Sequence, residues 1–372
     1  MTGVVVTGWS ALTSAGIGVD ALAAAVAGVE RAGVGARAPA SQGVGVGHLY
    51  PEPLPSPTGH ALVDFNVREQ LGRKGTSTYD RVTGLAVVCC QDALRRAGMT
   101  IDDSTRTRVG VALGTSLGSF KSTSDYSRET LVQDRPYLVN PMLFPNTVMN
   151  CAAGQVAIRF RLRGPNATVA GGTLAFLNAV RYASNIIERG YADVMLCGAV
   201  EEYTPHRAWA AHLTGATRTV AAGEGAGVFV LAGPQAADWA GARRIAGVLA
   251  VTTGYGPGGG SQADAALAGC VRRALGRAGV DPSEVGTVLT GDTDEDDRRE
   301  YGPVVQALGH EPRRIMAKRL LGECDAASGA VSLAVLLALG ERGISLLTSR
   351  GPDGAVGAAV VKGLADGGAD RG

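Results

Sequence analysis

The sequence predicts an α/β fold, with largely parallel sheets that carry helices on both faces. Short and nearly continuous apolar runs, such as residues 192–200, are typical of strands covered on both faces. These runs alternate with segments of helical periodicity, most clearly residues 174–188, as in chains built from β-α-β units. The order of elements in residues 1–235 recurs in residues 240–372, which indicates two related halves.

In the first half, apolar runs predict strands at residues 3–7, 108–113, 166–170, 192–200 and 228–231. Helical periodicity predicts helices at residues 19–27, 79–97, 119–134 and 174–188, and another that opens near residue 146. Asp80 lies near the start of the helix at 79–97, and Gly98 and Gly190 follow two of these helices as C-terminal caps. Residues 31–60 are rich in Gly and Pro, so we expect an irregular surface segment there.

The second half repeats this order of elements without repeating the residues. Residues 245–252 correspond to the first strand, 262–278 to the helix at 79–97, and 285–289 to the strand at 108–113. Residues 328–340 correspond to the helix at 174–188, and residues 355–361 to a closing strand. We therefore expect a first domain at residues 1–235 and a second at residues 240–372.

Composition argues against several classes of partner and location. The 372 residues are 45% hydrophobic, enough for a sizeable core, and carry a formal net charge of +1. This balance argues against nucleic acid or a membrane as the main partner. The six cysteines lack metal-ligand or disulfide spacing and are expected to be reduced thiols, mostly buried. No apolar run approaches the roughly 18 residues of a membrane span and no signal segment is present, so we expect a cytoplasmic location.

The centre of the chain holds a strand, a tight turn and a helix. The turn is Ala170-Gly171-Gly172-Thr173, between the strand at 166–170 and the helix at 174–188. Many α/β enzymes place a nucleophile at such a turn, where backbone N–H groups and the helix dipole stabilise a thiolate or an oxyanion. Gly171 and Gly172 have no side chain that can attack a substrate. The sequence therefore predicts a nucleophile site without a nucleophile.

Several motifs, in the same order along the chain, resemble the β-ketoacyl synthase branch of the thiolase-like fold. The matching passages include GVVVTG at 3–8, LGRKGTSTYDRVTGLA at 71–86, VGVALGTSLG at 109–118, FPNTVMNCAAGQVAIRFRLRGPN at 144–166, RYASNIIERGYADVMLCGAVEE at 181–202 and GEGAGVFVLA at 223–232. Weaker matches follow at 320–331 and in the tail. The resemblance implies two pseudo-repeated halves in a five-layered αβαβα arrangement.

In the family that this chain resembles, one cysteine and two histidines carry out a Claisen condensation. The cysteine position falls on Gly171, and the histidine positions fall on Thr290 and Glu323. Lys318, which accompanies the second histidine in the family, persists. The C-terminal gate, usually Gly-Phe-Gly-Gly, is replaced by GAVG at 354–357. None of the histidines falls in either motif: His48, His60, His206, His212 and His310. The resemblance therefore implies that the chain does not condense acyl chains alone.

Family members that keep the fold without the catalytic residues resemble the chain length factors of type II polyketide synthases. The resemblance implies a heterodimer with a catalytic ketosynthase subunit, an acyl carrier protein with a 4'-phosphopantetheine-bound polyketide as second partner, and no cofactor. It also implies that Phe120, Thr123 and Ser127 line the acyl tunnel and set chain length. Their spacing places them on one helix face. Ser127 would leave the tunnel deep enough for a longer product, such as a reduced polyene. The alternative is that Phe120 is an ordinary core residue and the other two are solvated.

Other interpretations remain open at this point. The chain is alternatively a β-ketoacyl-ACP synthase-like acyltransferase with atypical catalytic residues, or a scaffold with no role in the tunnel. Some relatives carry Gln at the cysteine position and decarboxylate the extender unit, but Gly171 lacks that amide. The acidic run DTDEDD at 292–297 is expected to be a solvated loop and not a metal site. Cys324 is expected to be a structural thiol, and Lys318 a buried cation near Glu323.

Overall fold

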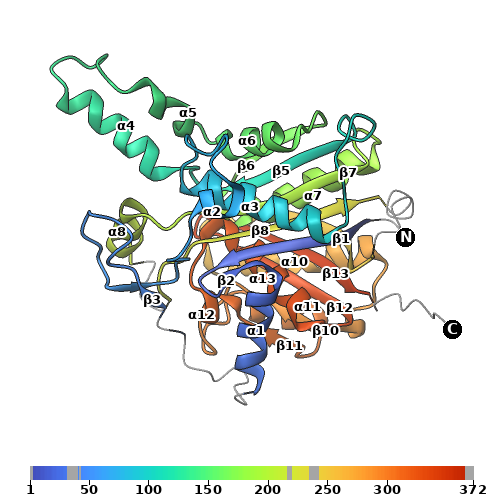
Figure 1. Ribbon diagram of the computed structural model, residues 1–372. Coiled ribbons are helices and arrows are strands. Elements are labelled where there is room, and N and C mark those ends of the chain that lie inside the picture. Colours follow the sequence, from blue (N-terminus) through green and yellow to red (C-terminus); the bar gives the residue numbers. More distant parts are fainter. Residues whose placement is uncertain (1–2, 32–40, 42, 216–219, 234–242, 365–372) are drawn as a thin grey trace.

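The fold was described from a computed structural model that covers residues 3–31, 41, 43–215, 220–233 and 243–364 (Figure 1). Two short strands, β3 (Val44–Gly45) and β4 (Thr58–Gly59), form a small hairpin-like pair. All the other described strands belong to one large sheet: β1 (Val4–Thr13), β2 (Gly16–Ile17), β5 (Val109–Thr115), β6 (Asn166–Ala170), β7 (Val194–Glu201), β8 (Gly225–Ala232), β9 (Ala246–Tyr255), β10 (Val285–Leu289), β11 (Arg313–Ile315), β12 (Gly343–Arg350) and β13 (Ala355–Gly363).

The sheet is built from two sets of strands with the same connectivity. Its order is β11-β10-β12-β13-β9-β1-β8-β7-β5-β6, with β2 paired to β1. In the first set β1 runs antiparallel to β8 and β8 to β7, while β5 is parallel to β7 and β6. The second set, β9-β13-β12-β10-β11, repeats this pattern, and the sets join where β1 pairs with β9. The expectation of largely parallel sheets is therefore wrong, because each closing strand turns back to pair with the first strand of its half.

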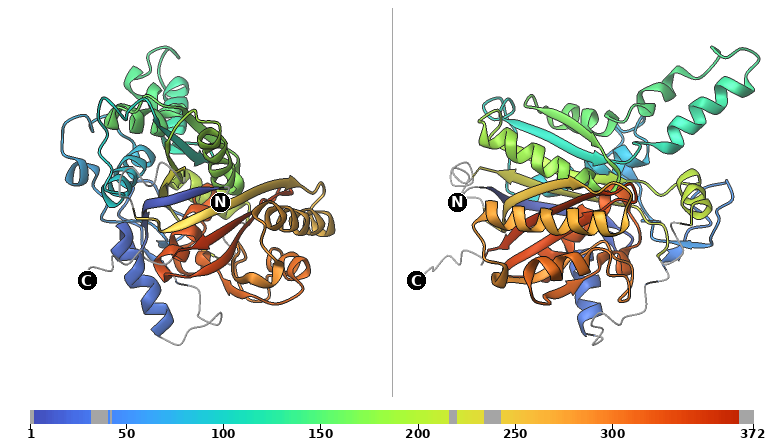
Figure 2. Two further views of the ribbon diagram at one scale, coloured as in Figure 1. Left: turned by 90° about the vertical axis from the view of Figure 1, so that its right-hand side faces the viewer. Right: turned by 180° about the vertical axis from the view of Figure 1, so that it is seen from behind.

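Helices cover the sheet in layers. The described α-helices are α1 (Gly18–Arg31), α2 (Val67–Leu71), α3 (Arg81–Arg96), α4 (Phe120–Val132), α5 (Phe144–Thr147), α6 (Cys151–Phe160), α7 (Ala175–Glu188), α8 (Pro205–Leu213), α10 (Gly260–Ala278), α11 (Tyr301–Leu308), α12 (Ala317–Leu321) and α13 (Ser328–Leu339). α3 and α6 pack on the outer face of the first set of strands, and α10 and α11 on the outer face of the second (Figure 2). α7 and α13 lie between the two sets. The layers are those of the thiolase-like fold. No helix in the described ranges is long and apolar enough to span a bilayer.

The two central helices show why this arrangement forms. α7 buries one side, including Phe176, Leu177 and Val180, and leaves Arg181 and Glu188 exposed. α13 is apolar on nearly all sides because both its faces are covered by protein. Phe176 packs on Phe229 of β8, with ring centroids 5.6 Å apart. Burying each phenylalanine contributes roughly 2–3 kcal/mol, which holds the layers together.

Most predicted elements are present, some with shifted ends. The strands at 166–170 and 285–289 have the predicted bounds, whereas the first strand continues to Thr13. Gly190 follows α7 with φ 72°, as expected of a C-terminal cap. The elements α8, α11, β11 and β12 were not predicted. The predicted domain boundary falls in residues 234–242, which lie outside the described part of the chain.

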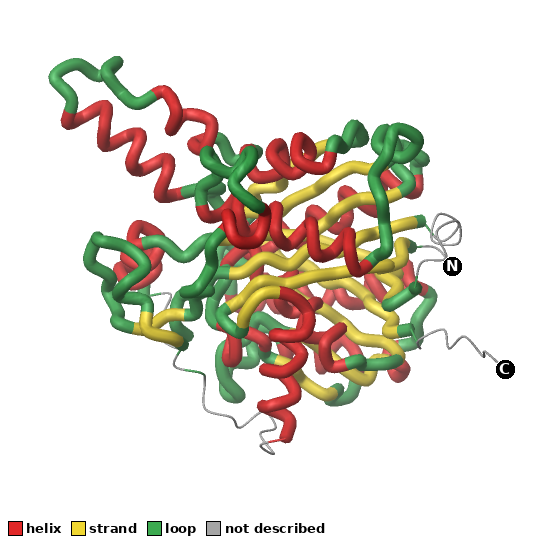
Figure 3. The backbone as a smooth tube through the Cα atoms, viewed as in Figure 1, coloured by secondary structure: helices red, strands yellow, loops and turns green. Residues whose placement is uncertain are grey.

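One pair of helices stands apart from the layered body. α4 and α5, with the segment between them, project from it as an arm, which we define as residues 120–147 (Figures 1 and 3). Large apolar side chains on the arm are exposed: Leu131 (83%), Tyr137 (68%), Met142 (62%), Val132 (57%), Phe144 (56%) and Leu138 (52%). Patches of this kind usually mark an interaction surface.

Candidate functional site

The turn at Gly171 keeps the geometry of a nucleophile site. β6 ends at Ala170, a short 3₁₀ turn, η2 (Gly172–Leu174), follows, and α7 begins at Ala175. A Cβ at Gly171 would lie 3.8 Å from the nearest atoms of Ala175 and Asn178, an ordinary contact distance. The φ of Gly171, −178°, is extended backbone that any residue adopts, unlike the φ of 53° at Gly172. Neither space nor φ therefore requires glycine at position 171.

The side chains at the two predicted histidine positions, Thr290 and Glu323, both make hydrogen bonds within the protein. Thr290 follows β10, is buried, and donates its backbone N–H to the carbonyl of Ile315 at 3.1 Å. Its hydroxyl accepts a hydrogen bond from Nε of Arg314 at 3.4 Å. Glu323 Oε1 accepts hydrogen bonds from Ser328 Oγ at 2.8 Å and from the N–H of Asp325 at 3.0 Å. Neither side chain supplies the imidazole of a condensing enzyme.

Lys318 connects these two positions. Its Nζ lies 2.6 Å from Glu323 Oε2, which confirms the predicted pairing. A Cβ at Gly291, next to Thr290, would lie 3.4 Å from the same Nζ. Burial alone lowers the pKa of Lys318, but the carboxylates of Glu323, Glu300 and Asp325 together outweigh burial, so the net pKa is raised. Lys318 is therefore held as a cation, and Glu323, at the predicted second histidine position, is its counter-ion.

The structure brings the predicted positions to one region and adds residues that sequence reasoning missed. Thr173, in the turn after Gly171, accepts a hydrogen bond at its carbonyl from Ser349 Oγ at 2.9 Å, and η2 contacts η4 (Asp325–Ala327). Glu300 is buried and accepts hydrogen bonds from the N–H of Gly291 and the hydroxyl of Thr348. Burial, followed by nearby Asp292, raises the pKa of Glu300.

Arg207 anchors the other side of this region. Its guanidinium pairs with Asp325 at 2.7 Å and donates to the carbonyls of Gly223 and Glu323 at 2.7 and 3.3 Å. Since the contacts of Arg207 come from distant segments, no local sequence pattern marks it. In this region the charged side chains of Lys318, Glu323 and Arg207 are paired or hydrogen-bonded, whereas position 171 in the adjacent turn carries no side chain.

His60 lies beside this network although it belongs to no catalytic motif. A Cβ at Gly322 would lie 2.6 Å from Cβ of His60, so the imidazole sits next to the Glu323 loop. Its Nδ1 lies 3.3 Å from Ser14 Oγ and its Nε2 lies 3.1 Å from the carbonyl of Ser41. Burial lowers its pKa, which favours the neutral ring. Both ring nitrogens have protein partners, so His60 connects the segments that contain Ser14 and Ser41. We therefore assign His60 a structural role and not that of a catalytic histidine.

Cys324 and the acidic run also have structural roles. Cys324 is fully buried, and burial raises its thiol pKa far above the ordinary value, so it stays protonated. Asp292 is buried and pairs with Arg314, and it accepts the N–H groups of Glu300 and Tyr301 at 2.9 and 3.0 Å. The expectation of a solvated loop is therefore wrong for Asp292, because this carboxylate caps the start of α11.

The predicted tunnel residues all lie on α4, as expected, but in different surroundings. The Phe120 ring packs on His206 of α8, with centroids 5.9 Å apart. Thr123 Oγ1 donates to the carbonyl of Ser119 at 2.9 Å, and Ser127 is exposed on the arm. None of these three side chains lines either of the two pockets described below. Their assignment to a tunnel remains a prediction.

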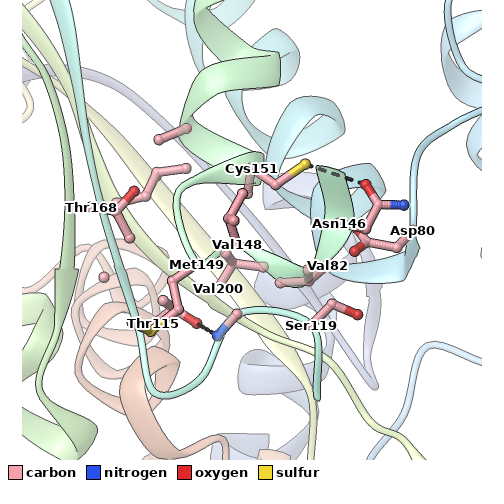
Figure 4. A pocket seen from close by; sticks show the side chains of 15 residues that line it. Asp80, Val82, Thr115, Ser119, Asn146, Val148, Met149, Cys151, Thr168 and Val200 are labelled. Atoms are coloured by element: carbon pink, nitrogen blue, oxygen red, sulfur yellow. Dashed lines mark hydrogen bonds between the residues drawn. The ribbon is translucent and has the colours of Figure 1, made fainter. Parts of the chain in front are cut away.

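A small pocket lies at the root of the arm (Figure 4). It encloses about 10 Å³, room for about one water molecule, between Ser119, Met149, Cys151 and Thr168. Cys151 Sγ lies 3.3 Å from Asn146 Oδ1, on the same rim. Thr168 Oγ1 is buried without a hydrogen-bond partner in the described chain, so an ordered water would satisfy it.

Two buried carboxyl groups, Glu201 and Glu202, and the half-buried Asp80 accept hydrogen bonds at the root of the arm. Glu201 accepts a hydrogen bond from Thr115 Oγ1 at 3.0 Å. Glu202 accepts bonds from Ser119 Oγ at 3.1 Å and from the N–H of Lys121 at 3.3 Å. Asp80 accepts one from Ser122 Oγ at 3.3 Å. Burial, followed by the charge of Asp80, raises the pKa of Glu202 to about 8. Glu202, at the point where the arm joins the body, therefore keeps its proton near neutral pH.

Residues 1–237 match the family described as Beta-ketoacyl synthase, N-terminal domain. The 3-oxoacyl-[acyl-carrier-protein] synthase 2 of Staphylococcus aureus (strain N315) is 28% identical over 251 residues, 60% of this chain and 59% of that protein. The protein of the same name from a Synechocystis species is 31% identical over 144 residues, 38% of this chain and 34% of that protein. Each match thus spans less than two thirds of the relative's length.

Solved structures resemble the chain over nearly its whole length. The structure described as the ishigamide ketosynthase/chain length factor superimposes with a TM-score of 0.80 at 32% identity, covering 98% of this chain and 100% of that chain. A β-ketoacyl synthase from Burkholderia phymatum STM815 superimposes with a TM-score of 0.83 at 20% identity, with the same coverage. A type II PKS acyl-carrier protein in complex with its ketosynthase gives 0.79 at 17% identity, again with the same coverage. The two weaker identities show the fold alone.

Proposed function

Since the chain belongs to the β-ketoacyl synthase family, we propose that it serves a type II polyketide synthase as a non-catalytic chain length factor. It would bind an active ketosynthase, whose cysteine holds the growing chain, and would form the far wall of the acyl tunnel. A chain stops growing when its end meets a barrier, so the shape of that wall sets product length.

One observation carries this proposal: the strand, the turn and the helix around Gly171 are all present, but position 171 has no side chain that could act as a nucleophile. The Cβ of a cysteine fits position 171 without a clash, and the N-terminus of α7 would stabilise its thiolate. The histidine positions hold Thr290 and Glu323, of which the second is tied to Lys318. Loss of all three groups on an intact scaffold fits a subunit that keeps the shape of the family and leaves the chemistry to its partner.

Two surfaces support the pairing with a ketosynthase. β6 lies at the end of the sheet and has no neighbour on its outer side in the described chain. An open edge strand of this kind readily adds a strand from another subunit. The arm beside it exposes Leu131, Tyr137 and Phe144, which a partner would cover. The similar structure named as a ketosynthase/chain length factor supports the same assembly.

The test of inactivity uses the isolated chain and the chain with a ketosynthase. Each sample receives malonyl and acyl carrier protein, and mass spectrometry follows acyl-enzyme and extended products. We expect no acyl-enzyme and no condensation from the isolated chain, and polyketide formation only with the ketosynthase. Condensation by the isolated chain would instead establish an acyltransferase with atypical residues.

The test of the tunnel enlarges Ser127. In the heterodimer, Ser127→Phe should place a barrier in the tunnel and shift the products to shorter chains. Arg128→Phe, a neighbouring exposed position that points about 100° away around the helix, is the control and should leave product length unchanged. An unchanged product length with both variants would favour a scaffold without a role in the tunnel.

A further inference from the structure

A cationic hollow lies on the surface of the N-terminal half, away from the turn at Gly171. It has a volume of about 420 Å³ and is lined by Arg106, Ala157, Ile158, Arg161, Leu162 and Arg163. The lining thus consists of arginines and apolar residues, with no carboxylate. The formal net charge of the whole chain is only +1, so this concentration of positive charge is local.

The arginine side chains in and near the hollow differ in whether they form hydrogen bonds and ion pairs within the protein. Arg159, in the last turn of α6, donates to the carbonyls of Leu71 and Lys74 at 2.9 and 3.2 Å. Arg161 and Arg163 are exposed, and neither makes an ion pair or a side-chain hydrogen bond to a described residue. Arg106 pairs with Asp103 at 2.7 Å through its Nη1, but its Nε is buried without a hydrogen-bond partner within the described ranges. The hollow therefore presents donors that lack acceptors.

The backbone holds these arginines in place. Arg163 donates its N–H to the carbonyl of Arg106 at 2.7 Å, and Gly164 donates to the carbonyl of Val109 at 3.1 Å. Arg161 ends α6 with φ 57°, a left-handed conformation that residues with a Cβ rarely adopt. Backbone of this kind clusters at functional sites. These backbone hydrogen bonds attach the loop to residues 106–109 before any partner arrives, which reduces the entropy lost on binding.

We propose that this hollow is a docking surface for the acyl carrier protein, a partner whose acidic helical face complements the arginines and whose apolar residues cover Ile158. Ile158 is 70% exposed at present. This inference rests on the proposed function, because that function brings a carrier protein to the complex. Charge complementarity of this kind steers encounter and orients the partner.

The position of the hollow agrees with that role. Arg161 and Arg163 lie just before the start of β6, the open edge strand. Two copies of one fold that pair along the same edge strand around a twofold axis do so antiparallel. The start of β6 then lies beside the end of the partner's equivalent strand, where the ketosynthase carries its cysteine turn. A carrier protein held at the arginines is therefore on the side where its acyl chain is transferred.

The experiment measures binding of a phosphopantetheine-bearing acyl carrier protein to the isolated chain and to the heterodimer by fluorescence anisotropy at several salt concentrations. The double variant R161E/R163E should weaken binding about tenfold or more in both samples and flatten its salt dependence. The double variant R272E/R277E, which makes the same charge change on exposed residues of α10, should leave the affinity unchanged. Size-exclusion chromatography checks that the heterodimer persists in each case.

Equal carrier affinity in R161E/R163E and R272E/R277E overturns the proposal. Loss of the heterodimer in R161E/R163E also overturns it, because the hollow would then be the seat of the ketosynthase. Since the isolated chain is titrated as well, the docking surface is tested even if no ketosynthase pairs with the wild-type chain. Failure of the proposed function and failure of this surface therefore give different results.

Discussion

The two halves of the sheet share one strand pattern but differ in the segment inserted at the same place. Between β5 and β6 the first half inserts residues 116–165, which include the apolar arm. Between β10 and β11 the second half inserts residues 290–312, in which Asp292 and Glu300 are buried and hydrogen-bonded. One insertion leaves apolar side chains exposed, whereas the other buries two carboxylates that are paired or hydrogen-bonded within the subunit. From this difference we expect the first half to meet the proposed partners and the buried charges of the second half to stabilise the subunit.

The largest effect is expected where the second half buries charge. Asp292→Ala would leave the Arg314 guanidinium, whose side chain is 9% exposed, without its counter-ion. It would also remove the acceptor of two backbone N–H groups at the start of α11. We expect a loss of about 3–5 kcal/mol of stability, seen as a lower thermal midpoint by circular dichroism.

The control in the same segment is Arg299→Ala. Arg299 pairs with Asp297 at 2.8 Å, but its side chain is 68% exposed. Solvent screens such a pair, so the expected loss is below about 1 kcal/mol. Equal losses in the two variants would contradict a stabilising role for the buried pair.

The next effect concerns the exposed surface of the first half. Tyr137→Asp, on the arm, should weaken association with the ketosynthase by about 2 kcal/mol, roughly thirtyfold, because aromatic residues often carry interface energy. Tyr255 in the second half is the matched control, since the two side chains are 68% and 63% exposed. Tyr255→Asp should leave association unchanged. Analytical ultracentrifugation measures both, and similar losses would refute the division between the halves.

A pH effect is expected at the root of the arm. The pKa of Glu202 is raised from 4.5 to about 8, first by burial and then by Asp80. Between pH 4.5 and 8 the unfolded chain releases this proton while the folded protein keeps it, so this group lowers stability as pH rises through that window. Glu202→Gln imitates the protonated form and should remove this pH-dependent loss of stability.

Thermal midpoints of wild type and Glu202→Gln, taken from pH 4.5 to 8.5, test this. The difference between them should grow with pH and then level off. Glu188→Gln, at an exposed position of α7, should run parallel to wild type at every pH. A constant difference between Glu202→Gln and wild type would show that Glu202 loses its proton well below neutral pH.

The smallest effect separates the two glycines of the central turn. Gly171→Ala should change stability by less than about 0.5 kcal/mol, because its Cβ meets ordinary contacts at 3.8 Å. Gly172→Ala should cost about 1 kcal/mol or more, since Gly172 has φ 53°. Chemical denaturation compares the two variants. A larger cost at position 171 would mean that its glycine is required by the backbone.

Local sequence patterns predicted many of the helices and strands, because the spacing of apolar residues and the positions of turn residues depend on neighbouring residues only. The strands at 166–170 and 285–289 are apolar runs bounded by turn or charged residues, and the structure reproduces their bounds. β11 (Arg313–Ile315) escaped prediction because two of its residues are charged, and only its pairing with β10 makes it a strand. The direction of the closing strands likewise depends on pairing with distant segments.

The sequence by itself determined which side chains the candidate site lacks. The resemblance predicts that Gly171, Thr290 and Glu323 stand where the family has its cysteine and histidines, and the sequence alone shows which residue types these are. Tertiary structure alone decided what fills the region instead. Arg207 and Glu300 reach it from separate segments, and His60 packs beside it without a motif. Whether a side chain is buried, paired or exposed depends on contacts between distant segments. The buried carboxylates of the second half and the exposed apolar arm of the first could therefore be recognised only in the folded structure.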